Sequence, residues 1–312
     1  MPKKRSDLFF HLVAFLTVAI WGTTYVCTRW MTNEGGMDEV NIFVIRFIIA
    51  YLIMLALNHK YMWADNWRDE LIFAGVGFMG GSAYFITENA ALRLTYANDV
   101  SIIVASSPLF TIIAIALLYK TKFALREYIG SILCLIGVLI IVMKSQVGGE
   151  TIDATVSPQD ALLGDGLALA SCLTWVVYTL LVRYVDHYPP LFVTRKMFFY
   201  GLVTALPMYF FYDLPDLHVV MNPYNLMNLL FLGCVASGFC FFSWNWCLAN
   251  LGSVKTSNWN YLIPLTTVIF GWIVLDEAVT FWFAVGAAAI LVGMYLASMP
   301  KKNNKEAEVE EI

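Results

Sequence analysis

The chain has 312 residues, of which 60% are hydrophobic and 13% charged, and its formal net charge is −4. Soluble domains average about 45–50% apolar and about 25% charged residues, so this composition excludes an ordinary soluble protein and indicates that much of the chain faces lipid. No polar stretch is long enough to form a catalytic domain outside the membrane, and a net charge of this size says little, because the distribution of Lys and Arg matters more in a membrane protein.

A bilayer is crossed by about 20 apolar residues, and the chain divides into about ten such segments joined by short polar loops. The predicted spans are residues 8–30, 39–57, 71–92, 97–118, 125–143, 162–184, 191–211, 224–249, 254–275 and 281–298. The first follows the basic sequence MPKKRSD but lacks a small-residue cleavage site, so it is predicted to be a retained helix. The loop 144–159 predicts a boundary between a first unit, residues 1–146, and a second, residues 160–312 with a charged tail.

Positive charge predicts the orientation of these spans. Lys and Arg gather at the N-terminus, in alternate loops and in the C-terminal tail, whereas the other loops are acidic, as at Asp38, Glu39, Asp213 and Asp276. The positive-inside rule therefore predicts a multi-pass protein of the inner (plasma) membrane with both termini in the cytoplasm. Because each half contains an odd number of spans, the second half is predicted to be inverted relative to the first.

The two halves also repeat each other in sequence, at a spacing of 156 residues from the third predicted span onward and at slightly shorter spacings before it. The matched pairs are Asn89 and Asn245, Pro108 and Pro264, Gly130 and Gly286, and Gly137 and Gly293. FVIR at residues 43–46 matches FVTR at residues 192–195, and Trp21 with Arg29 matches Trp175 with Arg183. Inverted repeats are a recurring design of secondary transporters, whose substrate site lies where the repeats meet.

The residues that repeat are similar to those of a known family. WGTTYV at residues 21–26, SSPLFTIIAIALLYKTKFALREYIGSILCLIG at 106–137 and YLIPLTTVIFGWIVLDEAVTFWFAVGAAAILVG at 261–293 resemble the EamA-type repeats of the drug/metabolite transporter superfamily. One departure is Lys120–Thr121, where the second copy has the acidic turn Asp276–Glu277. The resemblance implies an all-α membrane fold of ten helices, alternating access, and export or exchange of small metabolites, often amino acids.

Polar and aromatic residues inside the spans predict the substrate site. Trp21, Thr24 and Tyr25 share one helix face, and aromatic residues inside a span are explained less well by an interfacial belt than those at its ends. The predicted substrate-binding residues are Trp21, Thr24, Tyr25, Tyr84, Glu88, Ser106, Trp175, Tyr178, Trp244, Asn245, Asn258 and Tyr261. Pro108 and Pro264 are predicted helix kinks, either beside the cavity, where Asn260 would also lie, or used only in packing.

Charged residues at membrane depth are expensive and usually have a partner. Arg46, Glu88 and Arg195 are predicted to act in gating or in ion pairs, with Arg46 and Glu88 close enough to pair. Two other roles stay open: Glu88 carries a proton that couples transport to a gradient, or an arginine holds a substrate carboxylate.

Small residues predict packing instead. Gly130, Gly137, Gly286 and Gly293 fall on one face of their helices and favour a packing or dimer face, so the protein is expected to be a monomer or a homodimer.

The six cysteines lie within apolar segments, with no spacing typical of a disulfide framework or a metal site.

The sequence therefore predicts a secondary active or facilitative transporter, exporting small polar metabolites such as amino acids, with no cofactor, metal or nucleic acid. A nucleotide-sugar or sugar-phosphate exchanger is the alternative; it would need two or more cationic residues around the phosphate, for which Lys196 beside Arg195 is a weak signal. A non-transporting membrane protein or an intramembrane enzyme is a further alternative, but the spans contain no HExxH, GxSxG or paired catalytic aspartates.

Overall fold

The computed structural model describes residues 7–59, 62–95, 100, 103–145, 158–275 and 281–298, and these residues form helices and short connections without a strand. The first half contains α1 Asp7–Asn33, α2 Glu39–Leu57, α3 Trp67–Gly77, η1 Phe78–Ala83, α4 Tyr84–Leu94, α6 Ser107–Tyr119 and α7 Leu125–Ser145. The second half contains α8 Pro158–Val182, η2 Arg183–Val185, α9 Pro190–Ala205, η3 Leu206–Phe210, α10 Leu217–Val220, α11 Pro223–Leu230, η4 Phe231–Phe239, α12 Cys240–Leu251, α13 Ser253–Ser257, η5 Asn258–Leu262, α14 Ile263–Leu275 and α15 Phe281–Ser298. The predicted turn Asp276–Glu277 and the charged tail lie outside the described residues.

Apart from the four-residue α10, the described helices group into ten units that follow the ten predicted spans in order. Five are long and apolar enough to cross a bilayer on their own: Asp7–Thr32, Glu39–Leu57, Trp67–Leu94, Leu162–Val185 and Pro223–Leu251. Others are shorter or interrupted, as in the unit α13–η5–α14, where a 3₁₀ segment divides the helix. The prediction of an all-α membrane fold is confirmed.

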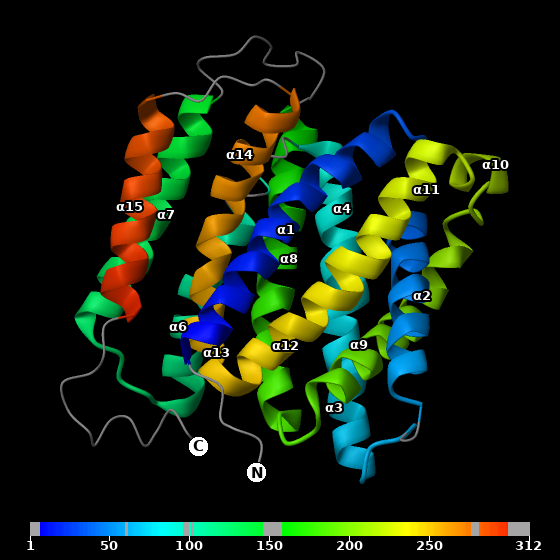
Figure 1. The fold of residues 1–312 in the computed structure, drawn as a ribbon, viewed down its shortest axis with the longest axis horizontal. Coiled ribbons are helices and arrows are strands. Elements are labelled where there is room, and N and C mark those ends of the chain that lie inside the picture. The colour runs from blue at the N-terminus through cyan, green and yellow to red at the C-terminus, as the bar shows by residue number, and fades with distance from the viewer. Residues whose placement is uncertain are drawn as a thin grey trace.

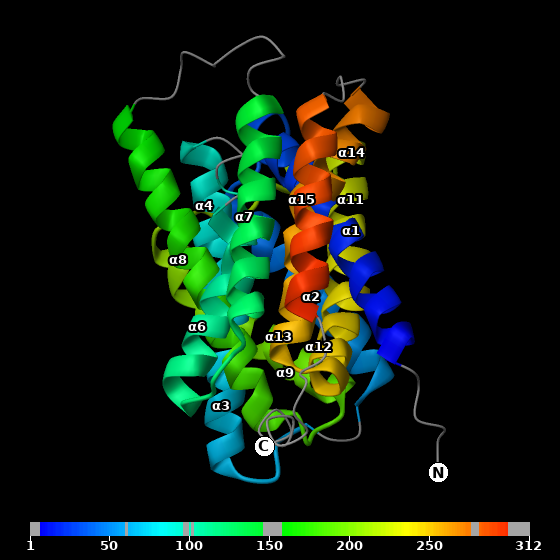
Figure 2. The ribbon, with the colours of Figure 1, turned by 90° about the vertical axis from the view of Figure 1, so that its left-hand side faces the viewer.

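Corresponding helices of the two halves run in opposite directions. In Figure 1 the chain enters α1 at the lower end and leaves α15 at the same end, whereas α7 ends and α8 begins at the opposite end. We call these the lower end and the upper end. Seen from the side, α7 and α15 stand together in front of the remaining helices, which enclose the core (Figure 2).

The glycines of the repeat explain why α7 and α15 lie so close. A Cβ atom on Gly130 would lie 2.6 Å from the carbonyl oxygen of Gly293, and one on Gly137 would lie 2.6 Å from that of Gly286. Only residues without a side chain permit this contact between two helix backbones. The predicted packing face is therefore real and is used inside one chain, between the last helices of the two repeats.

The third unit of each half contains a π-helical segment, η1 in the first and η4 in the second. Each lies between two α-helical segments, with η1 joining α3 to α4 and η4 joining α11 to α12. An i→i+5 segment inserts an extra residue and rotates the following side chains about the helix axis, and such segments are frequent at functional sites.

The two prolines differ from their predicted role as kinks inside a continuous helix. Pro108 is the second residue of α6 and follows a turn at Ser106, and Pro264 is the second residue of α14 and follows the 3₁₀ segment η5. The first turn of a helix leaves its N–H groups without intrahelical partners, so a proline there removes no bond. The prolines thus mark where an interrupted span resumes as an α-helix.

Candidate functional site

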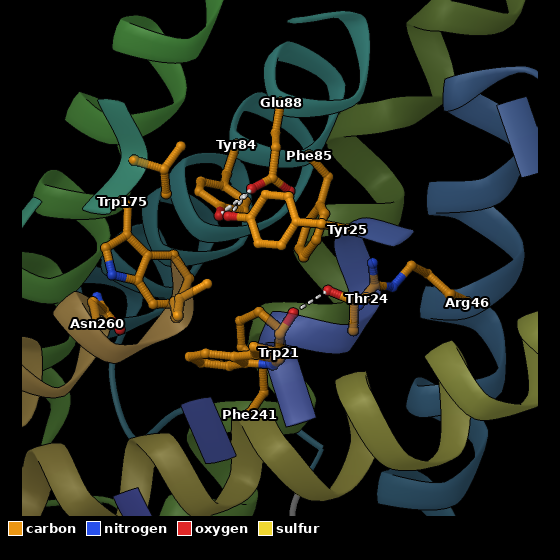
Figure 3. A pocket seen from close by; sticks show the side chains of 12 residues that line it. Trp21, Thr24, Tyr25, Arg46, Tyr84, Phe85, Glu88, Trp175, Phe241 and Asn260 are labelled. Carbon is orange, nitrogen blue, oxygen red and sulfur yellow. Dashed lines mark hydrogen bonds between the residues drawn. The ribbon is translucent and has the colours of Figure 1, made fainter. Parts of the chain in front are cut away.

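A small enclosed cavity lies between the two halves, with a free volume of about 30 Å³. The first half lines it from α1, α2 and α4, and the second from α8, α12, η5 and α14. The lining residues are Trp21, Thr24, Tyr25, Arg46, Tyr84, Phe85, Glu88, Val104, Trp175, Phe241, Asn260 and Ile263, and most are labelled in Figure 3. A volume of this size holds about one or two water molecules.

Glu88 is the acidic group of the cavity and is held by two tyrosines. The Tyr84 hydroxyl donates to Oε1 of Glu88 at 2.6 Å, and the Tyr25 hydroxyl donates to the same oxygen at 3.0 Å (Figure 3). Both tyrosines are buried and Glu88 is 8% exposed. No described residue donates a hydrogen bond to the second oxygen, Oε2, so this oxygen is open to a proton or to a donor on a ligand.

Arg46 is the basic group and reaches the cavity from α2. Its Nε donates to Ser237 Oγ at 2.9 Å, and its guanidinium carbon lies 4.5 Å from the centroid of the Phe85 ring, a cation–π contact. The predicted ion pair between Arg46 and Glu88 is absent from the described structure, although both residues line the cavity. Ser237 and Phe85 hold the guanidinium instead, which leaves its terminal nitrogens without an acceptor among the described residues.

Matched residues of the two repeats meet at the aromatic wall. The rings of Trp21 and Trp175 lie 5.5 Å apart at 86°, an edge-to-face contact, and Trp244 packs behind both at 5.0 and 5.9 Å. Trp21 Nε1 donates to the Ala236 carbonyl at 2.9 Å, whereas the buried Nε1 of Trp175 has no hydrogen-bond partner among the described residues. An unpaired buried N–H costs about 1–3 kcal/mol.

Asn260 adds a neutral polar group from η5. Its Nδ2 donates to Ser107 Oγ at 3.4 Å, a long hydrogen bond, and its buried Oδ1 has no partner among the residues that the structure describes. The second half thus contributes one buried acceptor, Asn260 Oδ1, and one buried donor, Trp175 Nε1, that no described residue pairs. The cavity thus combines a carboxylate, a guanidinium, two neutral polar groups and an aromatic wall.

The structure brings half of the predicted substrate-binding residues to this cavity. Those that line it are Trp21, Thr24, Tyr25, Tyr84, Glu88 and Trp175. The others lie in the surrounding packing: Ser106, Tyr178, Trp244, Asn245, Asn258 and Tyr261. Tyr178, for example, donates to Asn245 Oδ1 at 2.7 Å, and Asn245 Nδ2 donates to Thr194 Oγ1 at 2.9 Å. The polar groups of Tyr178 and Asn245 are therefore hydrogen-bonded within the protein. Phe85, Phe241 and Ser237 were not predicted, because an apolar ring or a single serine in an apolar span carries no signal of its own.

Arg195, the counterpart of Arg46, lies away from the cavity at the lower end. It donates to the carbonyl of Asn58 in the loop after α2, and the neighbouring buried Lys196 forms an ion pair with the partly exposed Glu70. Tyr188 donates to Asp69 Oδ2 and accepts from the Asp65 amide, both at 2.9 Å. Burial and then the Asp69 carboxylate raise the pKa of Tyr188 to about 12. The start of α9 is thereby fastened to the first half.

A related set of contacts fastens the halves at the upper end. Tyr212, after η3, donates to Glu39 Oε1 at 3.0 Å, and Asn41 donates to the Asp213 carbonyl at 3.2 Å. Asn225 donates to the Gly35 carbonyl at 2.9 Å. At the lower end, the N-terminal part of α9 thus contacts the loop that follows α2. At the upper end, the N-terminal part of α2 contacts the loop that follows α9 and η3.

A helical membrane bundle of two inverted halves around an enclosed, charged cavity has the architecture of a membrane transporter. The EamA-like transporter family matches residues 8–143 and 162–299, once for each half, and the chain belongs to this family. Two relatives are each named an uncharacterized transporter: a protein of Archaeoglobus fulgidus, 26% identical over 92% of this chain and 96% of its own, and YoaV of Bacillus subtilis, 24% identical over 89% and 92%. A solved crystal structure covers 93% of this chain and 98% of its own with a TM-score of 0.71 and 17% identity, which supports the fold.

Proposed function

We propose that this transporter is a secondary carrier that exports small polar metabolites, amino acids among them, by alternating access through the cavity between the repeats. The observation that carries the proposal is the presence of one guanidinium and one carboxylate in the same enclosed space without an ion pair between them. A zwitterion offers a carboxylate to the first and an ammonium to the second, and the aromatic wall suits an apolar body between them.

The size of the cavity supports a closed resting state. About 30 Å³ is too small for an amino acid, so the aromatic rings must move apart before a solute binds. The contacts between the halves at the lower and upper ends support this account, because the cavity can open toward one side when only the contacts at that end break. By this account Arg195 belongs to the gate at the lower end, which the charge distribution assigns to the cytoplasm.

The cation content of the cavity disfavours the alternative of a sugar-phosphate or nucleotide-sugar exchanger. Arg46 is the single Lys or Arg among the described lining residues, and the second candidate pair, Arg195 with Lys196, is engaged with Asn58 and Glu70. Phosphate groups are bound best by several cationic donors that converge.

Flux into liposomes tests the proposal. Purified protein is reconstituted with a solute inside, and uptake of labelled leucine, phenylalanine, a hexose phosphate and a nucleotide sugar is followed by counterflow. We expect saturable counterflow of an amino acid, lost in Arg46→Gln and retained in Arg93→Gln, whose side chain is 60% exposed outside the cavity. Counterflow of a phosphate ester alone, or none above protein-free vesicles, would contradict it.

A further inference from the structure

The two arginines of the repeat have the same place in sequence but different surroundings. Arg46 ends FVIR in α2 and lines the cavity, whereas Arg195 ends FVTR in α9 and binds the Asn58 carbonyl at the lower end. Both side chains are at most 3% exposed, so burial does not distinguish them. The difference must come from what each guanidinium meets on the neighbouring helices.

The third unit of the opposite half provides that difference. In the second half, η4 carries Ser237, which is fully buried and accepts from Nε of Arg46 at 2.9 Å. The residue 156 positions earlier is Gly81 in η1, which has no hydroxyl to offer Arg195. A Cβ at Gly81 would lie 3.1 Å from Gly201 Cα, so the first repeat has closely packed backbone where the second has a serine.

The hydrogen bond from Arg46 to Ser237 uses Nε, the guanidinium nitrogen nearest the backbone of Arg46. Phe85 covers one face of the group at 4.5 Å, so the position and the tilt of the plane are both set. The two terminal nitrogens have no acceptor among the described residues, and Figure 3 shows the side chain reaching from α2 toward Thr24 and the cavity. Two parallel N–H donors held in this way match the two oxygens of a carboxylate.

We propose that Ser237 is a positioning residue that turns the Arg46 guanidinium into the cavity and makes Arg46 the anchor for a carboxylate on the transported solute. This rests on the proposed function and adds which repeat recognises the anionic group and which residue decides it. The asymmetry between Ser237 and Gly81 gives the cavity one carboxylate anchor rather than two.

The test compares Ser237→Ala with a matched serine. Ser82→Ala is the control, because Ser82 is buried in the related segment η1, lies outside the cavity and bonds Thr204 at 2.7 Å. Leucine and leucinamide are the probes, since leucinamide lacks the carboxylate. We expect Ser237→Ala to raise the KM for leucine about tenfold with kcat changed less than twofold, because a hydrogen bond to a charged group is lost. Ser237→Thr, which keeps the hydroxyl, restores the KM, and Ser82→Ala leaves it unchanged.

Binding measured by calorimetry on solubilised protein keeps the inference separate from transport. Wild-type protein that binds leucine more tightly than leucinamide, with the preference lost in Ser237→Ala, supports the inference even if liposomes show no flux and the proposed function fails. Equal weakening for both probes, or no change relative to Ser82→Ala, overturns it, and so does a wild-type protein that binds neither. If Ser237→Ala does not fold, Ser237→Gly, which copies Gly81, takes its place in the same comparison.

Discussion

Glu88 is a carboxylate inside a membrane bundle that is held by hydroxyls and not by a cation. Both of its hydrogen bonds, from Tyr25 and Tyr84, reach the same oxygen, so the other oxygen is free of described partners. Without a neighbouring cation in contact, the protonated and ionised forms differ less in free energy than they would in a buried ion pair. This environment suits a residue that gains and loses a proton during a cycle.

Glu88→Gln tests that role. The amide still accepts from the tyrosines but cannot ionise, and it binds the solute ammonium less tightly than a carboxylate does. We therefore expect counterflow to persist with a raised KM, while accumulation driven by an imposed pH gradient is lost. Uptake is measured in liposomes with and without the gradient. Glu127→Gln is the control, because Glu127 is a buried carboxylate in the first turn of α7 that caps the Ala124 amide, away from the cavity. Gradient-driven accumulation by Glu88→Gln equal to that of the control would rule out the proton role.

For single residues, the sequence predicted which side chains line the cavity better than it predicted which side chains they contact. Trp21, Tyr25, Tyr84, Glu88 and Trp175 were predicted from helix spacing inside apolar spans, and all line the cavity. The pairing of Arg46 with Glu88 was predicted from depth alone and is absent, because depth does not reveal the angle around a helix axis. Neither the Phe85 ring on which the guanidinium lies nor the serine that holds it leaves a periodic signal.

At the scale of single helices, α7 and α15 pack against each other as an antiparallel pair. Gly130 contacts Gly293 and Gly137 contacts Gly286. Because the two helices are antiparallel, each glycine lies against the counterpart of the other glycine on its own helix. None of the described side chains of α7 and α15 lines the cavity. We therefore assign this pair to support of the bundle and not to recognition of a solute.

Gly130→Val should lower stability without changing recognition. The valine meets the Gly293 carbonyl and Ala297, and overpacking of this kind costs about 1–3 kcal/mol. Gly166→Val in α8 is the control, since a Cβ there has no atom within 4 Å and the loss of glycine is the same. The midpoint of thermal unfolding in detergent should fall for the first variant more than for the second, with the KM for solute unchanged in both. Equal midpoints would show that the two helices can separate without loss.

Element bounds were predicted well where a span is uninterrupted. The predicted spans 39–57 and 281–298 coincide with α2 and α15, because apolar composition and flanking polar residues determine where such helices end. The interruptions at Pro108 and Pro264 were predicted as kinks, but not that the preceding segment would end there and a new α-helix begin. The π segments η1 and η4 were not predicted, because apolar composition does not distinguish an α-helical from a π-helical turn.

For the whole molecule, the inverted repeat produces related contacts of unequal strength at the two ends. The lower end contains the ion pair of the buried Lys196 with the partly exposed Glu70, and the Tyr200 hydroxyl and the Ala64 amide also donate to Glu70. The upper end relies mainly on hydrogen bonds to carbonyls and on Tyr212 with Glu39. A buried ion is costly when its partner is lost, so the lower end should be the more sensitive to mutation.

Lys196→Met tests this difference. It leaves Glu70 without its cation and should destabilise the protein by about 3 kcal/mol, at the low end of the range for buried pairs because the Glu70 side chain is 20% exposed. Adding Glu70→Gln should recover much of the loss, since the amide still bonds Tyr200 and carries no charge. Arg93→Met, which removes the largely exposed partner of Glu39, should cost less than about 1 kcal/mol. Thermal unfolding of the three proteins checks the order, and a double variant less stable than Lys196→Met would contradict it.

The narrowness of the cavity has a consequence for the membrane around the protein. Protons cross proteins along connected chains of water, and a space for one or two molecules walled by tryptophan and phenylalanine rings holds no such chain. We therefore expect no proton conduction through this cavity in the conformation described, so that a proton gradient across the bilayer is not dissipated along this route.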